Sequence, residues 1–365
     1  MPMKTSFAAA FCLLLLSCIS VDAEAGRTST QSWNYTVPER INSMTLLNDS
    51  VVVGCEDSFV YAIDSDGRLK WAYQTDGSVK AVYGYGDEVA AASTDGFVYL
   101  LGGDGNVQWM KHIPMYVGYN QAIHMLDDLI VAGSMDGSVY AFNRNGVFLW
   151  YYKTDSYVLS TRVVDDRIVA VSDKKVYFIN RDGTLWGLFD SGTYIASSYL
   201  TDDYIALNTE GNTITLLDME GDFLWNYSEK DFFGSIYVTN DSVTIGSRNG
   251  TLYFFAVNGS LLWRQDLDKS VTAVYSTQDY VAGSSMSHVL YIFDRKGKPK
   301  DAYGLNRYAT TIKGDRKRLI AGTSSGEIYA IDFMEKDPLL SVFAMVVMIL
   351  VILSAIFMLL RSWSY

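Results

Sequence analysis

The sequence predicts an all-β fold, an eight-bladed β-propeller built of four-stranded antiparallel blades. Three observations support this prediction. Aromatic residues are abundant, with 26 Tyr, 17 Phe and 8 Trp, and the chain has 29 Gly but only 5 Pro. Tryptophans recur along most of the chain at intervals of 36 to 41 residues. Within each interval, four short β-rich runs alternate with Asn, Asp and Gly turns, which is the pattern of a propeller blade.

The N-terminal segment has the features of a secretory signal peptide. Lys4 precedes an apolar run, and Ala23-Glu24-Ala25 fits the small-x-small pattern found before a cleavage site. We therefore expect residues 1–25 to be removed on export. The alternative is a lipoprotein signal, because Leu15-Leu16-Ser17-Cys18 is a passable lipobox in which Cys18 would be lipidated.

The tryptophan repeat defines modules of about 38 residues within a propeller domain at 26–335. Its members are Trp33, Trp71, Trp109, Trp150, Trp186, Trp225 and Trp263. One further step reaches Asp301, which makes eight modules. The second module shows the pattern of each, with Gly and Asp turns between its strands. Its predicted strands are 79–85, 88–93, 96–101 and 106–111.

Two columns in the first strand of each module point to the propeller axis. The first column holds only small residues, as expected where eight strands converge: Ser43, Ala81, Ala122, Ser160, Ser197, Ser235, Ala273 and Thr311. Two residues later, on the same strand face, lies a mixed column: Thr45, Tyr83, His124, Arg162, Tyr199, Tyr237, Tyr275 and Lys313. We interpret this second column as the lining of the central channel. Its cations would offer anion-binding groups, and the alternative is a lining that contacts only water.

Both ends of the repeat contribute to the last blade. The first module begins at its fourth strand, around 33–37, and the last module ends at its third, around 327–333. Pairing of these two segments would close the ring and hide two sheet edges.

An apolar run at 339–360 predicts a transmembrane helix after a short linker at 336–338. The run is long enough to cross a hydrocarbon core and lacks the polar stripe of a buried amphipathic helix. Arg361 follows it, within a tail at 361–365 that also contains Trp363 and Tyr365. Together with the signal peptide, this predicts a single-pass type I membrane protein with its propeller on the extracytoplasmic side.

Six N-x-S/T tripeptides suit an exported surface. These candidate N-glycosylation sites are Asn34, Asn48, Asn226, Asn240, Asn249 and Asn258. Aromatic residues in the loops before the first strands form a candidate partner rim, and the alternative is that they cap the blades. The rim residues are Tyr116, Tyr119, Tyr157, Phe232 and Phe233.

Charge and cysteine content exclude several classes of function. A net charge of −12 without clusters of Lys and Arg argues against nucleic-acid binding. Cys55 is the only thiol outside the N-terminal segment, so one mature chain has no disulfide framework and no Cys-based metal cluster. The three histidines, His112, His124 and His288, fall at different strand positions of different modules, which disfavours a shared metal site.

The module pattern Asp-Gly-x-Val-Tyr-x-Phe-Asn-x-x-Gly-x-x-x-Trp, seen at 136–150, resembles the PQQ-like or quinoprotein-type propeller repeat over about residues 30–335. The resemblance implies that the recurrent Trp docks between neighbouring blades, and that the seam at Asp301 is looser. The family includes dehydrogenases that bind pyrroloquinoline quinone with calcium. This chain has neither their long insertions nor their adjacent cysteines, so we expect no cofactor, no metal and no catalytic residue.

These observations favour a non-enzymatic scaffold that binds protein partners and is displayed outside a membrane. In fold the chain looks most like the propeller that serves as a scaffold in bacterial outer-membrane protein assembly. Two alternatives remain. One is a quinone-dependent redox protein, and the other is a cell-surface receptor or adhesin that binds a small ligand or glycan at the channel mouth.

Overall fold

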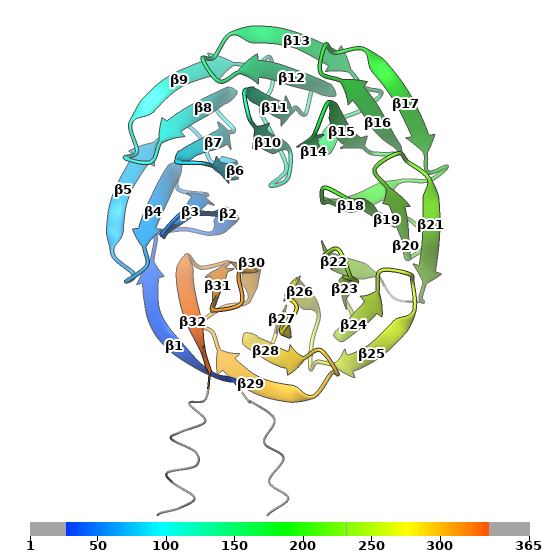
Figure 1. Cartoon of the computed structure of the whole chain (residues 1–365). Helices are drawn as coiled ribbons and strands as arrows, with labels where there is room; N and C mark the ends of the chain where they lie inside the picture. The colour runs from blue at the N-terminus through cyan, green and yellow to red at the C-terminus, as the bar shows by residue number, and fades with distance from the viewer. Residues whose placement is uncertain (1–26, 231, 336–365) are drawn as a thin grey trace, which may run out of the picture. The chain divides into compact units, whose positions relative to one another are not determined.

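The computed structural model describes residues 27–230 and 232–335, and confirms the eight-bladed propeller (Figure 1). Residues 31–332 form one compact unit. The predicted signal peptide at 1–25, the linker at 336–338, the transmembrane helix at 339–360 and the tail at 361–365 lie outside the described residues. Within the described residues, no helix is long and apolar enough to cross a membrane.

The first four blades each use four consecutive strands in antiparallel order. Blade one contains β2 (Ile41–Leu47), β3 (Ser50–Cys55), β4 (Phe59–Asp64) and β5 (Leu69–Gln74). Blade two contains β6 (Val79–Tyr85), β7 (Glu88–Ser93), β8 (Phe97–Gly102) and β9 (Val107–His112). Blade three contains β10 (Ile123–Leu126), β11 (Leu129–Gly133), β12 (Ser138–Asn143) and β13 (Phe148–Lys153). Blade four contains β14 (Val158–Val164), β15 (Arg167–Ser172), β16 (Lys175–Asn180) and β17 (Leu185–Asp190).

The next three blades repeat this order, and the eighth joins both ends of the repeat. Blade five contains β18 (Ile195–Leu200), β19 (Tyr204–Thr209), β20 (Thr213–Asp218) and β21 (Phe223–Ser228). Blade six contains β22 (Phe233–Val238), β23 (Ser242–Ser247), β24 (Thr251–Ala256) and β25 (Leu261–Asp266). Blade seven contains β26 (Val271–Ser276), β27 (Tyr280–Ser285), β28 (Val289–Asp294) and β29 (Pro299–Gly304). Blade eight contains β30 (Ala309–Gly314), β31 (Arg318–Thr323), β32 (Glu327–Glu335) and β1 (Arg27–Thr36).

The closing pair in blade eight is β32 with β1, as the sequence predicts. The Val37 amide donates to the Gly326 carbonyl at 2.9 Å, and the Ser32 hydroxyl donates to the Ala330 carbonyl at 3.2 Å. These bonds join residues almost 300 positions apart, so the ring is closed by hydrogen bonds between strands of one sheet.

The hydrophobic core lies between neighbouring blades. The second strand of a blade is covered on both faces, and all six residues of β3 and of β7 are buried. The fourth strand is the outermost, and in β5 only the third and fifth residues are partly covered. The third residue of each fourth strand faces the next blade, which is where the tryptophans stand.

Six tryptophans dock onto the next blade through the same two contacts. Each indole N–H donates to a backbone carbonyl in the turn between the third and fourth strands of that blade, at 2.7 to 3.0 Å. These residues are Trp33, Trp71, Trp109, Trp150, Trp225 and Trp263. The indole lies against a turn glycine with positive φ. At Gly105, where φ is 81°, an added Cβ would stand 2.6 Å from the Trp71 ring.

Trp186 differs from this expectation. Its neighbour Gly187 pairs with Phe178 at the position where the other blades have tryptophan, so Trp186 is one residue out of register. A one-residue offset turns a strand side chain to the opposite face. Trp186 is therefore exposed and stacks under the Arg167 guanidinium, 4.0 Å from the ring centroid. Phe178 fills the seam instead, and a Cβ on Gly221 would lie 2.7 Å from its ring.

Asp301 does occupy the tryptophan position of blade seven, opposite Ile292. The tryptophan is missing here for a topological reason. In blade eight the third and fourth strands come from opposite ends of the chain, so no turn joins them and none is available to receive an indole.

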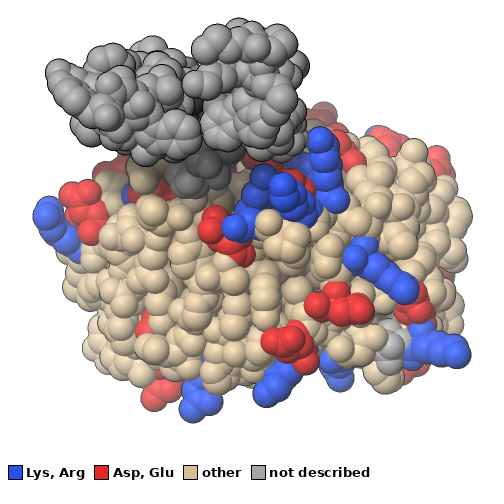
Figure 2. All heavy atoms as spheres, turned by 90° about the horizontal axis from the view of Figure 1, so that it is seen from below, with Lys and Arg blue, Asp and Glu red and all other residues tan. Residues whose placement is uncertain are grey.

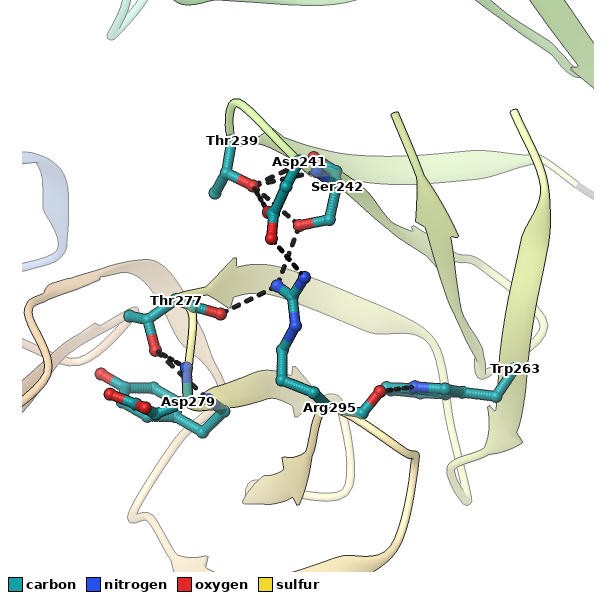
Figure 3. A network of polar contacts seen from close by, with 8 residues as sticks. Thr239, Asp241, Ser242, Trp263, Thr277, Asp279 and Arg295 are labelled. Carbon is teal, nitrogen blue, oxygen red and sulfur yellow. Dashed lines mark hydrogen bonds and ion pairs between the residues drawn. The ribbon is translucent and has the colours of Figure 1, made fainter. Parts of the chain in front are cut away.

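An arginine strengthens several of the tryptophan seams, as Figure 3 shows for blades six and seven. The Arg295 carbonyl accepts the Trp263 indole N–H at 3.0 Å. Its guanidinium donates to Asp241 at 2.7 Å and to the Thr277 carbonyl at 2.9 Å, which links the two blades. Arg144 and Arg181 occupy the same turn position and pair with carboxylates of the preceding blade. The seams therefore combine apolar docking with a partly buried ion pair.

We predict that the seam, and not the presence of tryptophan, determines stability. Trp109→Ala and Phe178→Ala should each lower the free energy of unfolding by about 3 kcal/mol, because both side chains fill a space between blades. Trp186→Ala should lower it by less than about 1 kcal/mol, because its side chain is largely exposed. Urea unfolding of the three variants measures these values. A loss at Trp186 as large as that at Trp109 would contradict the assignment.

Candidate functional site

The first strands of all eight blades surround the centre of the ring (Figure 1). Residues of these strands line a central cavity of about 500 Å³. All eight residues of the mixed column contribute to its wall, namely Thr45, Tyr83, His124, Arg162, Tyr199, Tyr237, Tyr275 and Lys313. The period-2 alternation of the first strands explains this placement, since residues two apart share one face of the sheet. Leu46 and Ala196, also in the wall, are exposed, so solvent reaches the cavity.

A short insertion in blade three also reaches the cavity. In blade one, two positions separate the buried Ile41 from Ser43, whereas five separate the equivalent Val117 from Ala122. The extra residues place 119–121 in the cavity wall. The Gln121 carbonyl accepts the Thr161 amide of blade four at 2.9 Å, and the Asn120 carbonyl accepts the Ser43 hydroxyl of blade one at 3.5 Å.

This insertion escaped the sequence interpretation, although one signal was present. The interval from Trp109 to Trp150 is 41 residues, three more than the interval of 38 in the two preceding modules. Nothing in the sequence indicates that the extra residues turn toward the axis instead of outward, because that direction depends on contacts with blades one and four.

Arg162 and Lys313 are the two cations of the wall, and their environments differ. The Arg162 guanidinium donates to Asp202 at 2.7 and 3.0 Å and to the Leu200 carbonyl at 3.2 Å, so its charge is neutralised within the protein. Lys313 projects from blade eight, and its ammonium lies 5.9 Å from the centre of the Tyr199 ring of blade five. This contact joins blades three apart in the ring, so the ammonium stands in the bore.

Tyrosine rings form an arc along one side of the cavity. The ring centroids of Tyr199 and Tyr237 are 5.0 Å apart, and those of Tyr237 and Tyr275 are 4.6 Å apart. Burial raises the pKa of Tyr199 to about 12 and raises the pKa values of the other two further. All three hydroxyls therefore keep their protons at neutral pH. The Tyr275 hydroxyl donates to the Gly314 carbonyl.

His124 is the most enclosed titratable group of the wall, with 3% of its surface exposed. Its Nδ1 accepts the Val163 amide at 3.2 Å, so the proton of the neutral ring resides on Nε2, which has no hydrogen-bond partner among the described residues. The Tyr83 ring packs against it at 4.1 Å between centroids. Burial, together with the nearby Arg162 charge, holds the pKa of His124 well below its usual 6.5.

The described residues contain no group of three His, Cys, Asp or Glu side chains that could hold a metal ion. The acidic segment Asp64-Ser65-Asp66-Gly67 forms a turn, in which Asp64 Oδ1 accepts the amides of Asp66 and Arg68 at 2.9 and 2.8 Å. The Cys55 thiol is buried, and burial raises its pKa, which keeps it protonated.

The five residues of the candidate rim do not form one exposed surface. Phe233 is 3% exposed and packs in the core between blades five and six, so it does not belong to a rim. Tyr116, Tyr119 and Tyr157 are half-buried, and the last two stack at 5.7 Å between centroids. Phe232 is 61% exposed. The adjacent positions 232 and 233 alternate between solvent and core, as strand geometry requires.

The outer wall carries more exposed apolar surface than the rim does. We define the outer apolar band as the exposed side chains of the fourth strands of blades three and four: Phe148, Leu149, Tyr151, Leu185, Trp186 and Leu188. By contrast, β29 exposes no large apolar side chain. Figure 2 views the outer wall from the side of β29 and β1, where Lys, Arg, Asp and Glu side chains are interspersed with uncharged surface.

The six candidate glycosylation sites, Asn34, Asn48, Asn226, Asn240, Asn249 and Asn258, are all exposed. Asn34 and Asn226 lie on the outer strands β1 and β21, and the other four lie in turns. Each position is therefore accessible for a sugar, and occupancy remains a prediction.

We predict a pH dependence of stability that originates at His124. The unfolded chain takes up a proton at the usual pKa, whereas the folded chain excludes it, so acid favours unfolding. Lowering the pH from about 7.5 to about 5.5 should cost about 1.4 kcal/mol of stability through this group. His124→Asn should remove that part of the slope, whereas the exposed His112→Asn should not. Denaturant unfolding at both pH values is the measurement, and equal slopes in the wild type and His124→Asn would contradict the prediction.

Comparisons with known proteins agree with this architecture. The chain resembles the crystal structure of a computationally designed protein, Ika8, at 17% identity and a TM-score of 0.71, over 81% of this chain and 97% of that one. It resembles BamB from Moraxella catarrhalis at 16% identity and 0.70, over 85% and 99%. It resembles Saccharomyces cerevisiae Sqt1 at 14% identity and 0.71, over 85% and 100%. These likenesses show the fold.

No curated protein matches the sequence significantly. The family model described as outer membrane protein assembly factor BamB matches residues 18–124 and 120–300, which is most of the chain. The match spans blades one to six and most of blade seven, and it includes all six docked tryptophans. The chain therefore belongs to the PQQ-like propeller family of the outer membrane protein assembly factor BamB.

Proposed function

We propose that the chain is a non-enzymatic protein-interaction scaffold, anchored to a membrane by residues 339–360 with its propeller on the extracytoplasmic side. Membership of the family described as an assembly factor supports the scaffold role. The observation that carries the proposal on this chain is the outer apolar band, because exposed large apolar and aromatic side chains are typical of protein-binding sites.

The geometry of the band favours a partner that docks on the outer strands. The fourth strand of each blade has one strand neighbour in its sheet, so the backbone groups along its other edge are available. Exposed apolar edge strands invite pairing with another chain, and an extended peptide binds such an edge through main-chain hydrogen bonds. In β13 and β17 the apolar side chains flank this edge, with Tyr151 60% and Trp186 47% exposed.

The membrane topology is proposed from the sequence. We infer a single membrane anchor from the apolar run at 339–360. We infer export of the propeller from the signal peptide at 1–25. The exposure of all six candidate glycosylation sites supports a propeller that is accessible to a glycosylation machinery.

We predict that the outer apolar band captures a protein partner in native membranes. A photo-crosslinking amino acid at Trp186 should yield a discrete protein adduct, and the same substitution at Lys300 should not. Lys300 is the matched control because it is the second residue of β29, as Trp186 is of β17.

Charge on the band should then abolish the capture. Trp186→Glu with Tyr151→Glu should reduce co-purification of the adduct's partner by about tenfold or more, as expected for aromatic residues at the centre of an interface. Lys300→Glu should leave it unchanged. If the native protein proves solitary in its membrane, or if the adduct is equally strong at Lys300, the scaffold proposal fails.

We predict that intact vesicles protect the tail and not the propeller. Protease added outside cells or spheroplasts should digest the propeller, and a tag after Tyr365 should survive until the membrane is opened.

Enzymatic removal of glycans should lower the mass of the native protein, and combined Asn→Gln changes at the six sites should remove that shift. A propeller that is protected in intact cells would reject the topology, and an unshifted mass would reject glycosylation.

A further inference from the structure

The ammonium of Lys313 has no anionic partner. It makes no hydrogen bond or ion pair with another described residue, whereas the other wall cation, Arg162, is matched by Asp202. The Tyr199 ring centre, at 5.9 Å, is at the outer limit of a cation–π contact and accepts none of the three N–H donors of the ammonium. Lys313 thus contributes an uncompensated positive charge to the cavity.

The cavity wall contains no carboxylate. Its described lining residues are apolar, hydroxyl, amide, aromatic or cationic, although the whole chain has 41 acidic residues against 29 basic ones. Lys313 is half-buried, and burying a charge lowers stability unless the charge is paired. The charge balance of the wall, one matched cation and one unmatched cation, corresponds to a ligand with a single negative charge.

The shape and the aromatic lining restrict the ligand further. A volume of about 500 Å³ lies within the range of small-molecule sites. The arc of Tyr199, Tyr237 and Tyr275 presents successive rings, the first of which lies next to the Lys313 ammonium. The raised pKa values of the three tyrosines keep their hydroxyls protonated. Aromatic faces pack well against a flat or cyclic body.

We propose that the central cavity binds a small organic monoanion, a carboxylate attached to a ring, with the Lys313 ammonium as the counter-ion of the carboxylate and the tyrosine arc against the ring. This site is separate from the outer apolar band. The binding proposal therefore goes beyond the scaffold function and is tested independently of that function. The ligand replaces the missing partner of Lys313 and leaves Arg162 paired with Asp202.

Calorimetric titration of the full-length protein tests the proposal with two ring carboxylates and their neutral counterparts, benzoate against benzamide and glucuronate against glucose. At least one acid should bind, and at least tenfold more tightly than its neutral counterpart. Lys313→Met should weaken acid binding at least tenfold. Lys317→Met should leave it unchanged, because this exposed lysine lies four residues away and outside the cavity wall.

Two further measurements keep a folding defect apart from a binding defect. Lys313→Met should show the unfolding temperature of the wild type or a higher one, because it removes an unpaired charge from a half-buried position. Lys313→Arg should retain the preference for the acid over its neutral counterpart, because it keeps the charge. A folded Lys313→Met variant that binds the acids as the wild type does would overturn the proposal, as would a wild type that binds neither acid or prefers neither to its neutral counterpart.

The pH dependence of binding gives a second readout. Burial lowers the pKa of Lys313 from the usual 10.5, and an anion would favour its protonated form. Acid affinity should therefore fall as the pH rises toward 10.5, and Lys313→Met should show no such fall. The three tyrosines of the arc keep their protons in this range, because their pKa values are raised. A flat profile in the wild type would also contradict the proposal.

Discussion

The contact on which the rest of this structure depends is the docking of one fourth-strand residue onto the turn of the next blade. The indole needs a carbonyl acceptor and a turn residue that lacks a Cβ, which is a glycine, and one turn supplies both. Each such contact sets the spacing of two blades. Seven seams of this kind, together with the strand pair β1–β32, close the ring. A change in the spacing of two blades at one seam therefore alters the whole ring, and the width of the bore at its centre depends on the seams.

Because the docking contacts lie at the periphery, the side chains of the first strands can vary without disturbing them. Small residues such as Ser43 and Thr311 let eight strands approach the axis, and the residues two positions further on differ from blade to blade. Lys313 reaches from blade eight toward Tyr199 of blade five only because this space is open. The insertion at 119–121 also lines this space, and it makes hydrogen bonds with blades one and four.

The exception at the fourth seam connects the interior to the surface. Phe178 fills the space between blades four and five. Gly187 therefore occupies the docking position, and Trp186, one residue earlier, faces outward. The exposed Trp186 then joins Leu185, Leu188 and the apolar side chains of β13 on the outer wall. The use of Phe178 in place of a tryptophan at this seam thus accounts for part of the apolar surface that we assign to partner binding.

Strand number, turn positions, closure by the two ends and the lining of the bore could all be read from the sequence, because they depend on local turn residues and on a period of two along each strand. The register of Trp186 and the burial of Phe233 could not, because a one-residue offset is set by packing against the next blade. Nor could the isolation of Lys313, which depends on which side chains of distant blades face it across the closed ring. The sequence alone determined the eight-bladed ring and the residues along its axis, and only the tertiary structure decided which of them remain without a partner.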